Sequence, residues 1–302
     1  MRADGFWFAV YVCIQRRLHM RKIIISTDSP ADVPPEIQTR YGIRIAPLHI
    51  ILDAQSYEDG VNIKPSELIA FYKESGKLPK TSAVSIAEYI DFFEALREEC
   101  DAVVHLSFSA KLSSTYQNAV LAAEEVENVY VVDSKSLTTG ITLLCIKAAE
   151  LAEAGCDAQT IAHEMEYKRE KVVTTFVLDK LEFLHKGGRC SGVAAFGANI
   201  LGIKPSIVMK DGALIVGKKY RGKAEQCQMQ YVRDLLAQYA GQIDTDRVIL
   251  EYTEGVSEEQ LKALQKEVKK SLKCKEYIIS EAGCTITSHC GEKTFSLEFM
   301  LK

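Results

Sequence analysis

Short, almost continuously apolar segments alternate with amphipathic helical patterns along the first half of this chain. The apolar segments are "KIIIS" (22–26), "DAVVHL" (101–106) and "VYVVDS" (129–134). Apolar runs of this length without alternation are typical of strands in a parallel sheet that helices cover on both faces. The first half is therefore predicted to be an α/β domain with a mostly parallel sheet flanked by helices.

Prolines and glycines indicate where the intervening helices begin and end. "PPEIQTRYG" has prolines at its start and a glycine past its end, which is the usual asymmetry of helix termini. The segment "IRIAPLHIIL" (43–52) is expected to form one strand. Helices are predicted at residues 34–42, 64–76, within 81–100, and at about 137–154 and 157–170.

The pattern changes after about residue 170. "KPSIVMKDGALIVGKKY" (204–220) contains "KDG", a hairpin-type turn between two strands. Helices at about 222–240 and 257–270 flank the strand "DRVILEYTE". Further strands are predicted at "KVVTTFVLD", "KEYIIS", "CTITSH" and "KTFSLEFML". We therefore expect an α/β domain over 20–170 and a mixed α+β domain over 171–302.

Charge and cysteine usage exclude several classes of protein. The 302 residues carry a formal net charge of −4 without a basic stripe, so a nucleic-acid partner has no electrostatic support. The nine cysteines are scattered and form no C-x-x-C pair, which argues against a zinc site or a disulfide framework. Reduced thiols in the cytoplasm and no bound metal are expected.

The N-terminal segment differs from the rest. "GFWFAVYVCI" (5–14) is shorter than the roughly 20 residues of a membrane helix, and Arg16 and Arg17 follow it, the reverse of a signal peptide. No stable membrane insertion is therefore expected. Because Met20 directly precedes the first strand, residues 1–19 are expected to be a non-native or disordered extension. A short hydrophobic anchor or a packed N-terminal segment are the alternatives.

Four clusters of hydroxyl side chains stand where strands meet helices: "STDS" (26–29), "TSAVS" (81–85), "KLSSTY" (111–116) and "DSKSLTTG" (133–140). One helix cap needs one hydroxyl, so most of them are surplus to capping. Ligands of open parallel sheets bind beyond the carboxyl ends of the strands, and helix N-termini favour anions. The clusters predict a site for a carboxylate or a phosphate, and separate N-caps are the alternative.

Two residues of the second half are candidates to complete such a site. Arg189 in "LHKGGRCSG" could pair with an anion or form a surface ion pair, and His289 in "TITSHCG" could bind a ligand or serve as a structural hydrogen bonder.

The phosphate loop, the dinucleotide fingerprint and the G-x-S-x-G elbow are all missing from the sequence. An ATP site of the phosphate-loop type is therefore not expected.

Taken in order, these segments resemble the DegV family, the bacterial fatty-acid-binding proteins. The resemblance covers Met20 to Lys302 and depends on "TDSPADVP", "TSAVS", "KLSSTYQNA", "VVDSKSLTTG", "LEFLHKGGRCSG", "LGIKPSI" and "HCG". It implies two α/β domains and one long-chain fatty acid in an apolar tunnel, with no other cofactor. It also implies a non-enzymatic, acyl-carrying subunit of a two-component fatty acid kinase in phospholipid metabolism, whose separate dihydroxyacetone-kinase-like partner binds ATP and makes the acyl-phosphate.

The resemblance also assigns roles to individual residues. It implies carboxylate binding by Thr81, Ser82, Ser113, Ser114, Arg189 and His289. Candidates for the acyl tunnel are Val193, Phe196 and Ile200, and supporting residues are Thr27, Asp28 and Ser29.

Three departures from the family pattern are present. Ser114 stands where the family usually has glycine, "TSAVS" lacks the proline of "TSQPS", and Glu292 and Lys293 replace most of a "GPG" loop. Two other functions stay open. One is a lipid carrier or sensor without kinase coupling, and the other is a serine hydrolase or thioesterase with Ser113 as nucleophile and His289 as base.

Overall fold

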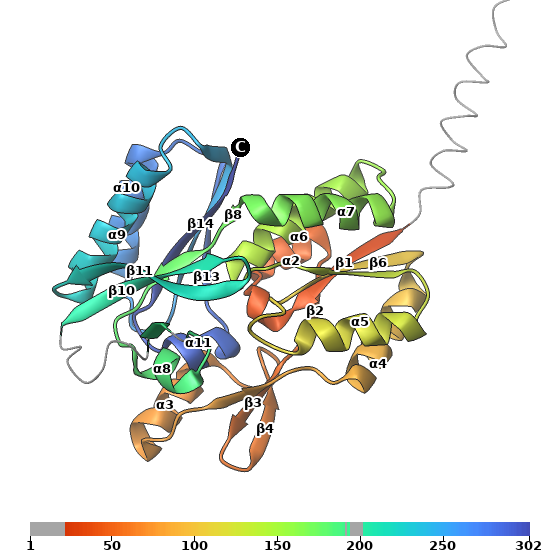
Figure 1. The fold of residues 1–302 in the computed structure, drawn as a ribbon, viewed down its shortest axis with the longest axis horizontal. Coiled ribbons are helices and arrows are strands. Elements are labelled where there is room, and N and C mark those ends of the chain that lie inside the picture. The colour runs from red at the N-terminus through yellow and green to blue at the C-terminus, as the bar shows by residue number, and fades with distance from the viewer. Residues whose placement is uncertain (1–21, 191, 194–201) are drawn as a thin grey trace, which may run out of the picture.

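The computed structural model describes residues 22–190, 192–193 and 202–302. The expected extension at 1–19 and the tunnel candidates Phe196 and Ile200 lie outside the described residues. Figure 1 shows two sheets side by side, with a small third sheet below their junction. None of the helices in the described ranges has the length and apolar character needed to cross a membrane.

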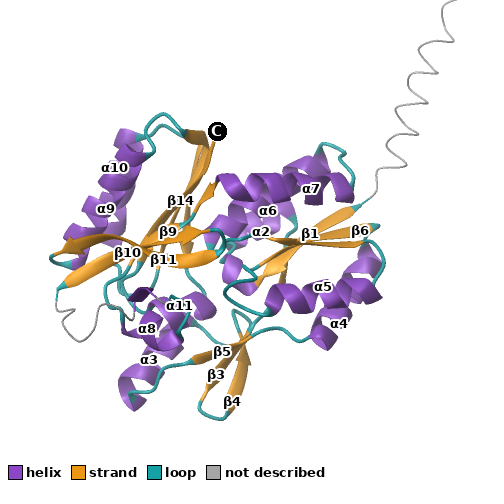
Figure 2. Ribbon diagram, in the orientation of Figure 1, coloured by secondary structure: helices purple, strands orange, loops and turns teal. Residues whose placement is uncertain are grey.

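The N-terminal sheet is entirely parallel, as predicted, with strand order β2-β1-β6-β7. Its strands are β1 (Ile23–Asp28), β2 (Arg44–Ala46), β6 (Ala102–Ser107) and β7 (Val129–Asp133). Helices α4 (Ile86–Glu99) and α5 (Thr115–Glu125) cover one face, and α2 (Pro35–Tyr41), α6 (Thr139–Glu153) and α7 (Ala158–Lys168) the other (Figure 2). Successive side chains of β1 point to opposite faces of the sheet. Ile24 therefore packs in the core with α4, and Ile25 packs in the core with α6.

The segment 43–52 forms two strands, so its prediction as one strand was wrong. β2 ends at Ala46, and β3 (His49–Leu52) belongs to a separate antiparallel sheet with β4 (Gln55–Glu58) and β5 (Lys80–Ser82). Pro47 lies at the break and offers no N–H for strand pairing. Helix α3 (Pro65–Ser75) lies beside this third sheet (Figure 1).

The C-terminal sheet has seven strands and is mixed, as predicted. Among the described strands of this sheet, β12 (Ile243–Tyr252) and β13 (Glu276–Glu281) pair in parallel and the others pair antiparallel. The hairpin of β10 (Ile203–Lys210) and β11 (Ala213–Arg221) turns at Asp211 and Gly212, which both have positive φ, as its sequence indicated. The other strands are β8 (Val172–Val173), β9 (Thr175–Val177) and β14 (Phe295–Leu301), and α9 (Ala224–Gln238) and α10 (Glu258–Ser271) pack on the sheet.

The segment "CTITSH" is helical, so its prediction as a strand was wrong. It forms α11 (Cys284–Cys290), next to the short helix α8 (Glu182–Gly187). Its β-branched residues favour a strand locally. The helix forms because Asp59 accepts hydrogen bonds from the N–H groups of Cys284 (2.8 Å) and Thr285 (3.0 Å) at its N-terminus.

The two halves meet over one continuous apolar core. It contains Val104 and Ile141 from the first half and Ile249 and Ile286 from the second. Short 3-10 helices lie at Ser29–Ala31 and Arg169–Lys171, the latter where the parallel domain gives way to the mixed sheet. The domain boundary near residue 170 stays a prediction.

Candidate functional site

A hydrogen bond between Thr81 and His289 connects the two halves of the chain. Thr81 lies on β5, where pairing with β3 sets it opposite Ile50, and His289 lies in the last turn of α11. Thr81 Oγ1 and His289 Nε2 are 2.9 Å apart. Because α11 is held at its other end by Asp59 of the first half, the position of His289 depends on both halves.

An apolar pocket with an empty volume of about 560 Å³ lies at this junction. Five of the six predicted carboxylate-binding residues line it, and Ser114 does not, since its side chain is exposed. The apolar wall comes from both halves and includes Leu48, Phe108, Leu112, Leu137, Phe176, Leu184, Leu214, Ile286 and Cys290. The polar residues that line it are Thr81, Ser82, Ser113, Arg189 and His289, with Thr285 beside them.

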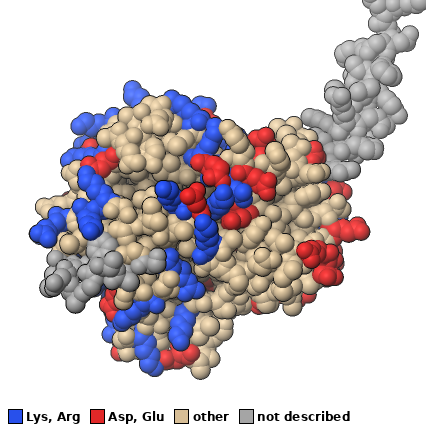
Figure 3. Space-filling model, in the orientation of Figure 1, with Lys and Arg blue, Asp and Glu red and all other residues tan. Residues whose placement is uncertain are grey.

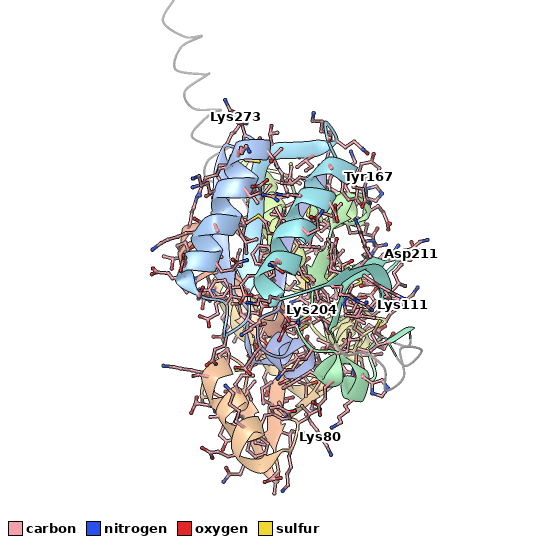
Figure 4. The ribbon with its side chains drawn as sticks, turned by 90° about the vertical axis from the view of Figure 1, so that its left-hand side faces the viewer. Lys80, Lys111, Tyr167, Lys204, Asp211 and Lys273 are labelled. Carbon is pink, nitrogen blue, oxygen red and sulfur yellow. The ribbon has the colours of Figure 1, made fainter. Side chains whose placement is uncertain are left out.

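A second, wider space of about 1330 Å³ adjoins the apolar pocket. Thr81, Arg189 and His289 line both, so these side chains mark where the two spaces meet. Lys77, Lys80 and Lys186 add positive charge to this outer cleft. Lys80 lies low in the molecule in Figure 4, and Figure 3 shows Lys and Arg side chains gathered in the same lower region. The junction is therefore a polar and cationic entrance to an apolar space.

Ser113 occupies the loop before α5, where the sequence predicted an anion site. Its Oγ lies 2.6 Å from Thr115 Oγ1 and accepts a hydrogen bond from Thr115 N at 3.2 Å. These bonds hold the Ser113 hydroxyl in the pocket wall at the start of a helix. A hydroxyl there adds a donor for a carboxylate without adding charge.

The His289 side chain is neutral at ordinary pH. Burial, together with the charge of Arg189, lowers its pKa to about 4. Its Nδ1 atom is enclosed and has no hydrogen-bond partner among the described residues. Gly187 permits this packing, since a Cβ atom at that position would lie 2.5 Å from Nδ1. A carboxylate bound nearby would favour protonation of this imidazole.

Arg189 is exposed at the junction of the two spaces. Its Nη1 donates to the carbonyl of Gly187, the last residue of α8, at 2.7 Å. Within the described ranges it forms no ion pair with a carboxylate, so the surface ion pair considered from the sequence is not found. Its remaining N–H groups can pair with an anion.

The three supporting residues lie behind the pocket and do not line it. Asp28 is fully buried and accepts hydrogen bonds from Phe108 N (2.7 Å) and Ser107 Oγ (2.8 Å). Burial raises its pKa, but His105, the Tyr89 hydroxyl and the N–H of Phe108 outweigh burial and hold the pKa below its usual value. Thr27 donates to Leu106 O at 2.7 Å, and Ser29 donates to Asp59 Oδ2 at 3.0 Å. The hydrogen bonds of Thr27, Asp28 and Ser29 therefore hold the backbone segments behind the pocket in place.

Among the tunnel candidates, only Val193 lies in the described part of the chain. It is buried in the core shared by Leu184 and Ile286, but it is not a lining residue of the pocket.

Sequence reasoning missed Asp59, which positions the helix that carries His289. Asp59 is buried and accepts hydrogen bonds from Cys284 N, Thr285 N and Ser29 Oγ. Nothing local marks it, because its partners on α11 lie more than two hundred residues away in the chain. Asp32, which accepts a hydrogen bond from Gly283 N at 2.8 Å, was missed for the same reason.

Comparisons with known proteins match the full extent of this architecture. A DegV domain-containing protein from Caldanaerobacter subterraneus subsp. tengcongensis is 34% identical over 280 residues, covering 90% of this chain and 96% of that protein. A solved DegV family protein from Thermus thermophilus, described by its fatty acid binding, has a TM-score of 0.84 at 31% identity and covers 93% of this chain and 100% of its own.

A stearic-acid-binding protein from Eubacterium ventriosum has a TM-score of 0.80 at 26% identity, over 92% of this chain and 98% of its own. The family model described as "Uncharacterised protein, DegV family" matches residues 22–302, which confirms the resemblance noted in the motifs. The chain belongs to the DegV family.

Proposed function

We propose that this protein binds one long-chain fatty acid and presents its carboxylate to a separate ATP-dependent kinase subunit in the cytoplasm. The observation that carries this proposal is the position of Thr81, Arg189 and His289, which line both the apolar pocket and the outer cleft. A carboxylate held there has its acyl chain in the apolar pocket and faces the cationic cleft.

The chemistry of the entrance supports carboxylate binding. Ser82, Ser113 and Thr81 supply hydroxyl donors, and Arg189 supplies the nearby full positive charge. Before a ligand binds His289 is neutral, so an incoming carboxylate meets the full charge of Arg189 and neutral donors beside it. Hydrogen bonds to a charged group are stronger than those between neutral groups, so a few suffice to hold the head group. The fatty acids bound by the relatives from Thermus and Eubacterium support the same ligand class.

The outer cleft supports coupling to a kinase. Lys77 pairs with Asp53 and Lys186 with Glu182, both at the surface. Lys80 is exposed on β5 next to Thr81, where its ammonium can neutralise an approaching phosphoryl group. Phosphoryl transfer requires chiefly positioning and charge stabilisation, which two proteins can share.

The geometry does not favour the serine hydrolase. Ser113 Oγ hydrogen-bonds with Thr115, whereas His289 Nε2 hydrogen-bonds with Thr81. No carboxylate of the described residues contacts His289 Nδ1. The nucleophile, base and acid of such an enzyme are therefore not connected.

Native mass spectrometry of the purified protein, before and after organic extraction, tests the binding. We expect a mass excess of one fatty acid per chain, and affinities reduced roughly tenfold or more in Ser113→Ala and His289→Ala. Ser114→Ala is the matched control, because its exposed side chain does not line the pocket. A delipidated protein that stays empty when offered fatty acids would contradict the proposal.

Kinase coupling needs a separate assay. The loaded protein is mixed with ATP and a dihydroxyacetone-kinase-like subunit, and acyl-phosphate is trapped with hydroxylamine. Product that depends on both proteins supports the kinase function. Tight fatty acid binding without product would indicate a carrier or sensor.

A further inference from the structure

The tip of the β10–β11 hairpin reaches across the molecule to the first half of the chain. Ser109, which is fully buried in the loop after β6, donates its hydroxyl to Gly212 O at 2.7 Å, although the two residues are 103 positions apart. Glycine permits this approach, since a Cβ atom on Gly212 would lie 2.9 Å from Ser109 Oγ and its φ of +78° favours glycine. Figure 4 shows the neighbouring residues Lys111 and Asp211 on the same side of the molecule.

Ser109 also organises the turn that carries Ser113. Its carbonyl accepts hydrogen bonds from the N–H groups of Leu112 (2.9 Å) and Ser113 (3.3 Å). Its own N–H donates to Ser136 O at 3.1 Å, which fixes the start of the turn. Leu112 and Ser113 both line the apolar pocket. This serine therefore links a pocket-lining turn of the first half to the hairpin of the second.

The first residues of β11 contact the segment that carries Arg189. Cys190 follows Arg189 directly, is buried, and donates its thiol to Leu214 O at 3.4 Å. Burial raises the pKa of this thiol, so the thiol keeps the proton that it donates. Val216 packs closely on Gly192, where a Cβ atom would lie 3.3 Å from Val216 Cγ2. Leu214 itself lines the apolar pocket.

The hairpin therefore contacts both segments that bring head-group residues to the entrance. One segment carries Ser113 and the other carries Arg189, and both residues line the apolar pocket. The carbonyls that hold the two segments belong to Gly212 and Leu214, which are close in the chain, so the backbone limits how far apart the two contacts can lie. A carboxylate that contacts Ser113 and Arg189 together requires a fixed distance between them.

We propose that the β10–β11 hairpin sets the separation of Ser113 and Arg189, and that Ser109 is a positioning residue for the fatty acid carboxylate. Ser109 acts through Ser113, because it lines neither the apolar pocket nor the outer cleft. This rests on the proposed fatty acid binding and deepens it. Hydrogen bonds weaken steeply when their geometry worsens, whereas burial of an acyl chain is not directional. A displaced Ser113 therefore weakens binding of the carboxylate more than binding of the chain.

The test compares octadecanoic acid with octadecanol, which has the same chain without the charge, as ligands of the delipidated full-length protein. We expect Ser109→Ala to bind octadecanoic acid on the order of tenfold more weakly than the wild type, and octadecanol within about twofold of the wild type. Ser206→Ala is the matched control, because Ser206 is buried in the same hairpin and donates within it, to Lys218 O at 3.2 Å. It should leave the ratio of the two affinities unchanged.

A double-mutant cycle with Ser113→Ala separates positioning from a general loss of stability. Because Ser109 acts through Ser113, the double variant should bind octadecanoic acid within about twofold of Ser113→Ala alone. Two losses of affinity that multiply in the double variant would overturn the inference. A Ser109→Ala variant that keeps the wild-type ratio of the two affinities would overturn it as well.

If Ser109→Ala does not fold, two substitutions of Cys190 decide the question. Cys190→Ala removes the donor to Leu214 O, and Cys190→Ser keeps a donor there. We expect octadecanoic acid, relative to octadecanol, to bind Cys190→Ala about threefold more weakly than Cys190→Ser. Equal ratios in the two variants would contradict a role of the hairpin in positioning the head group.

The wild-type protein tests the proposed function separately. Binding of neither ligand, or equal affinity for octadecanoic acid and octadecanol, would overturn carboxylate binding itself.

Discussion

Substituting Asp59 by alanine is expected to destabilise the protein and to weaken the candidate site at once. The change removes three hydrogen bonds, from Cys284 N (2.8 Å), Thr285 N (3.0 Å) and Ser29 Oγ (3.0 Å). Two of these donors are buried backbone N–H groups at the start of α11. An unpaired buried N–H costs about 1–3 kcal/mol and a lost helix cap about 1 kcal/mol, so the free energy of unfolding should fall by about 2–5 kcal/mol.

The same substitution should lower the affinity for a fatty acid. The N-terminus of α11 is held by Asp59 and the C-terminal end of the helix carries His289, so a helix that shifts moves the imidazole away from Thr81. We expect affinity to fall roughly tenfold, the effect of one hydrogen bond to a charged group.

Urea unfolding measures the change in stability. A titration of the protein with fatty acid measures the change in affinity. Asp91→Ala is the matched control, because Asp91 is exposed on α4 and its loss should change stability by less than about 0.5 kcal/mol. The reasoning is refuted if Asp59→Ala is as stable as Asp91→Ala. It is also refuted if Asp59→Ala loses stability but binds fatty acid as tightly as the wild type, since α11 would then not need this cap to position His289.

Three further outcomes follow from the structure. Gly187→Ala should weaken fatty acid binding, because its Cβ would lie 2.5 Å from His289 Nδ1; a titration that matches the wild type would contradict this packing. Lys80→Ala should slow acyl-phosphate formation but leave the Kd for fatty acid within about twofold of the wild type, since an exposed charge contributes little to binding a ligand it does not contact. Burial raises the pKa of Glu298 to about 8, so the unfolded chain loses this proton at lower pH than the folded chain and stability should fall as the pH rises from about 4 to about 8. Glu298→Gln should flatten that dependence, which urea unfolding at about pH 5 and pH 8 would show, and an unchanged slope would exclude Glu298 as its source.

The parallel sheet could be predicted from the sequence because its signals are local. β1, β6 and β7 are each a short apolar run, and the helices between them carry their own start and stop residues. The hydroxyl clusters were also visible at the ends of the strands, and the resemblance to the DegV family selected Thr81, Ser82 and Ser113 among them. A lining residue that lies in such a cluster can therefore be found without the structure.

Interactions across the two halves could not be predicted in the same way. The strand expected at "CTITSH" is a helix because Asp59 and Asp32 of the first half accept its terminal N–H groups. Burial raises the pKa of Glu251, and so does Asp32, which lies far away in the chain. Secondary-structure propensity reflects a residue and its neighbours in the sequence. The helix at "CTITSH" and the protonation of Glu251 instead depend on residues that are distant in the sequence and come close only in the folded chain.

The junction between the halves therefore combines two tasks. Thr81 and Ser113 come from the first half, and Arg189 and His289 from the second, so a carboxylate that contacts all of them is bound by both halves together. Behind it, buried Asp32 and Asp59 of the first half hold α11 of the second. A ligand that binds only when the halves are correctly packed stabilises that packing by its own binding free energy. Under the proposed function a bound fatty acid is then a structural element of the junction, and stability against unfolding should rise with fatty acid concentration in the wild type and much less in His289→Ala.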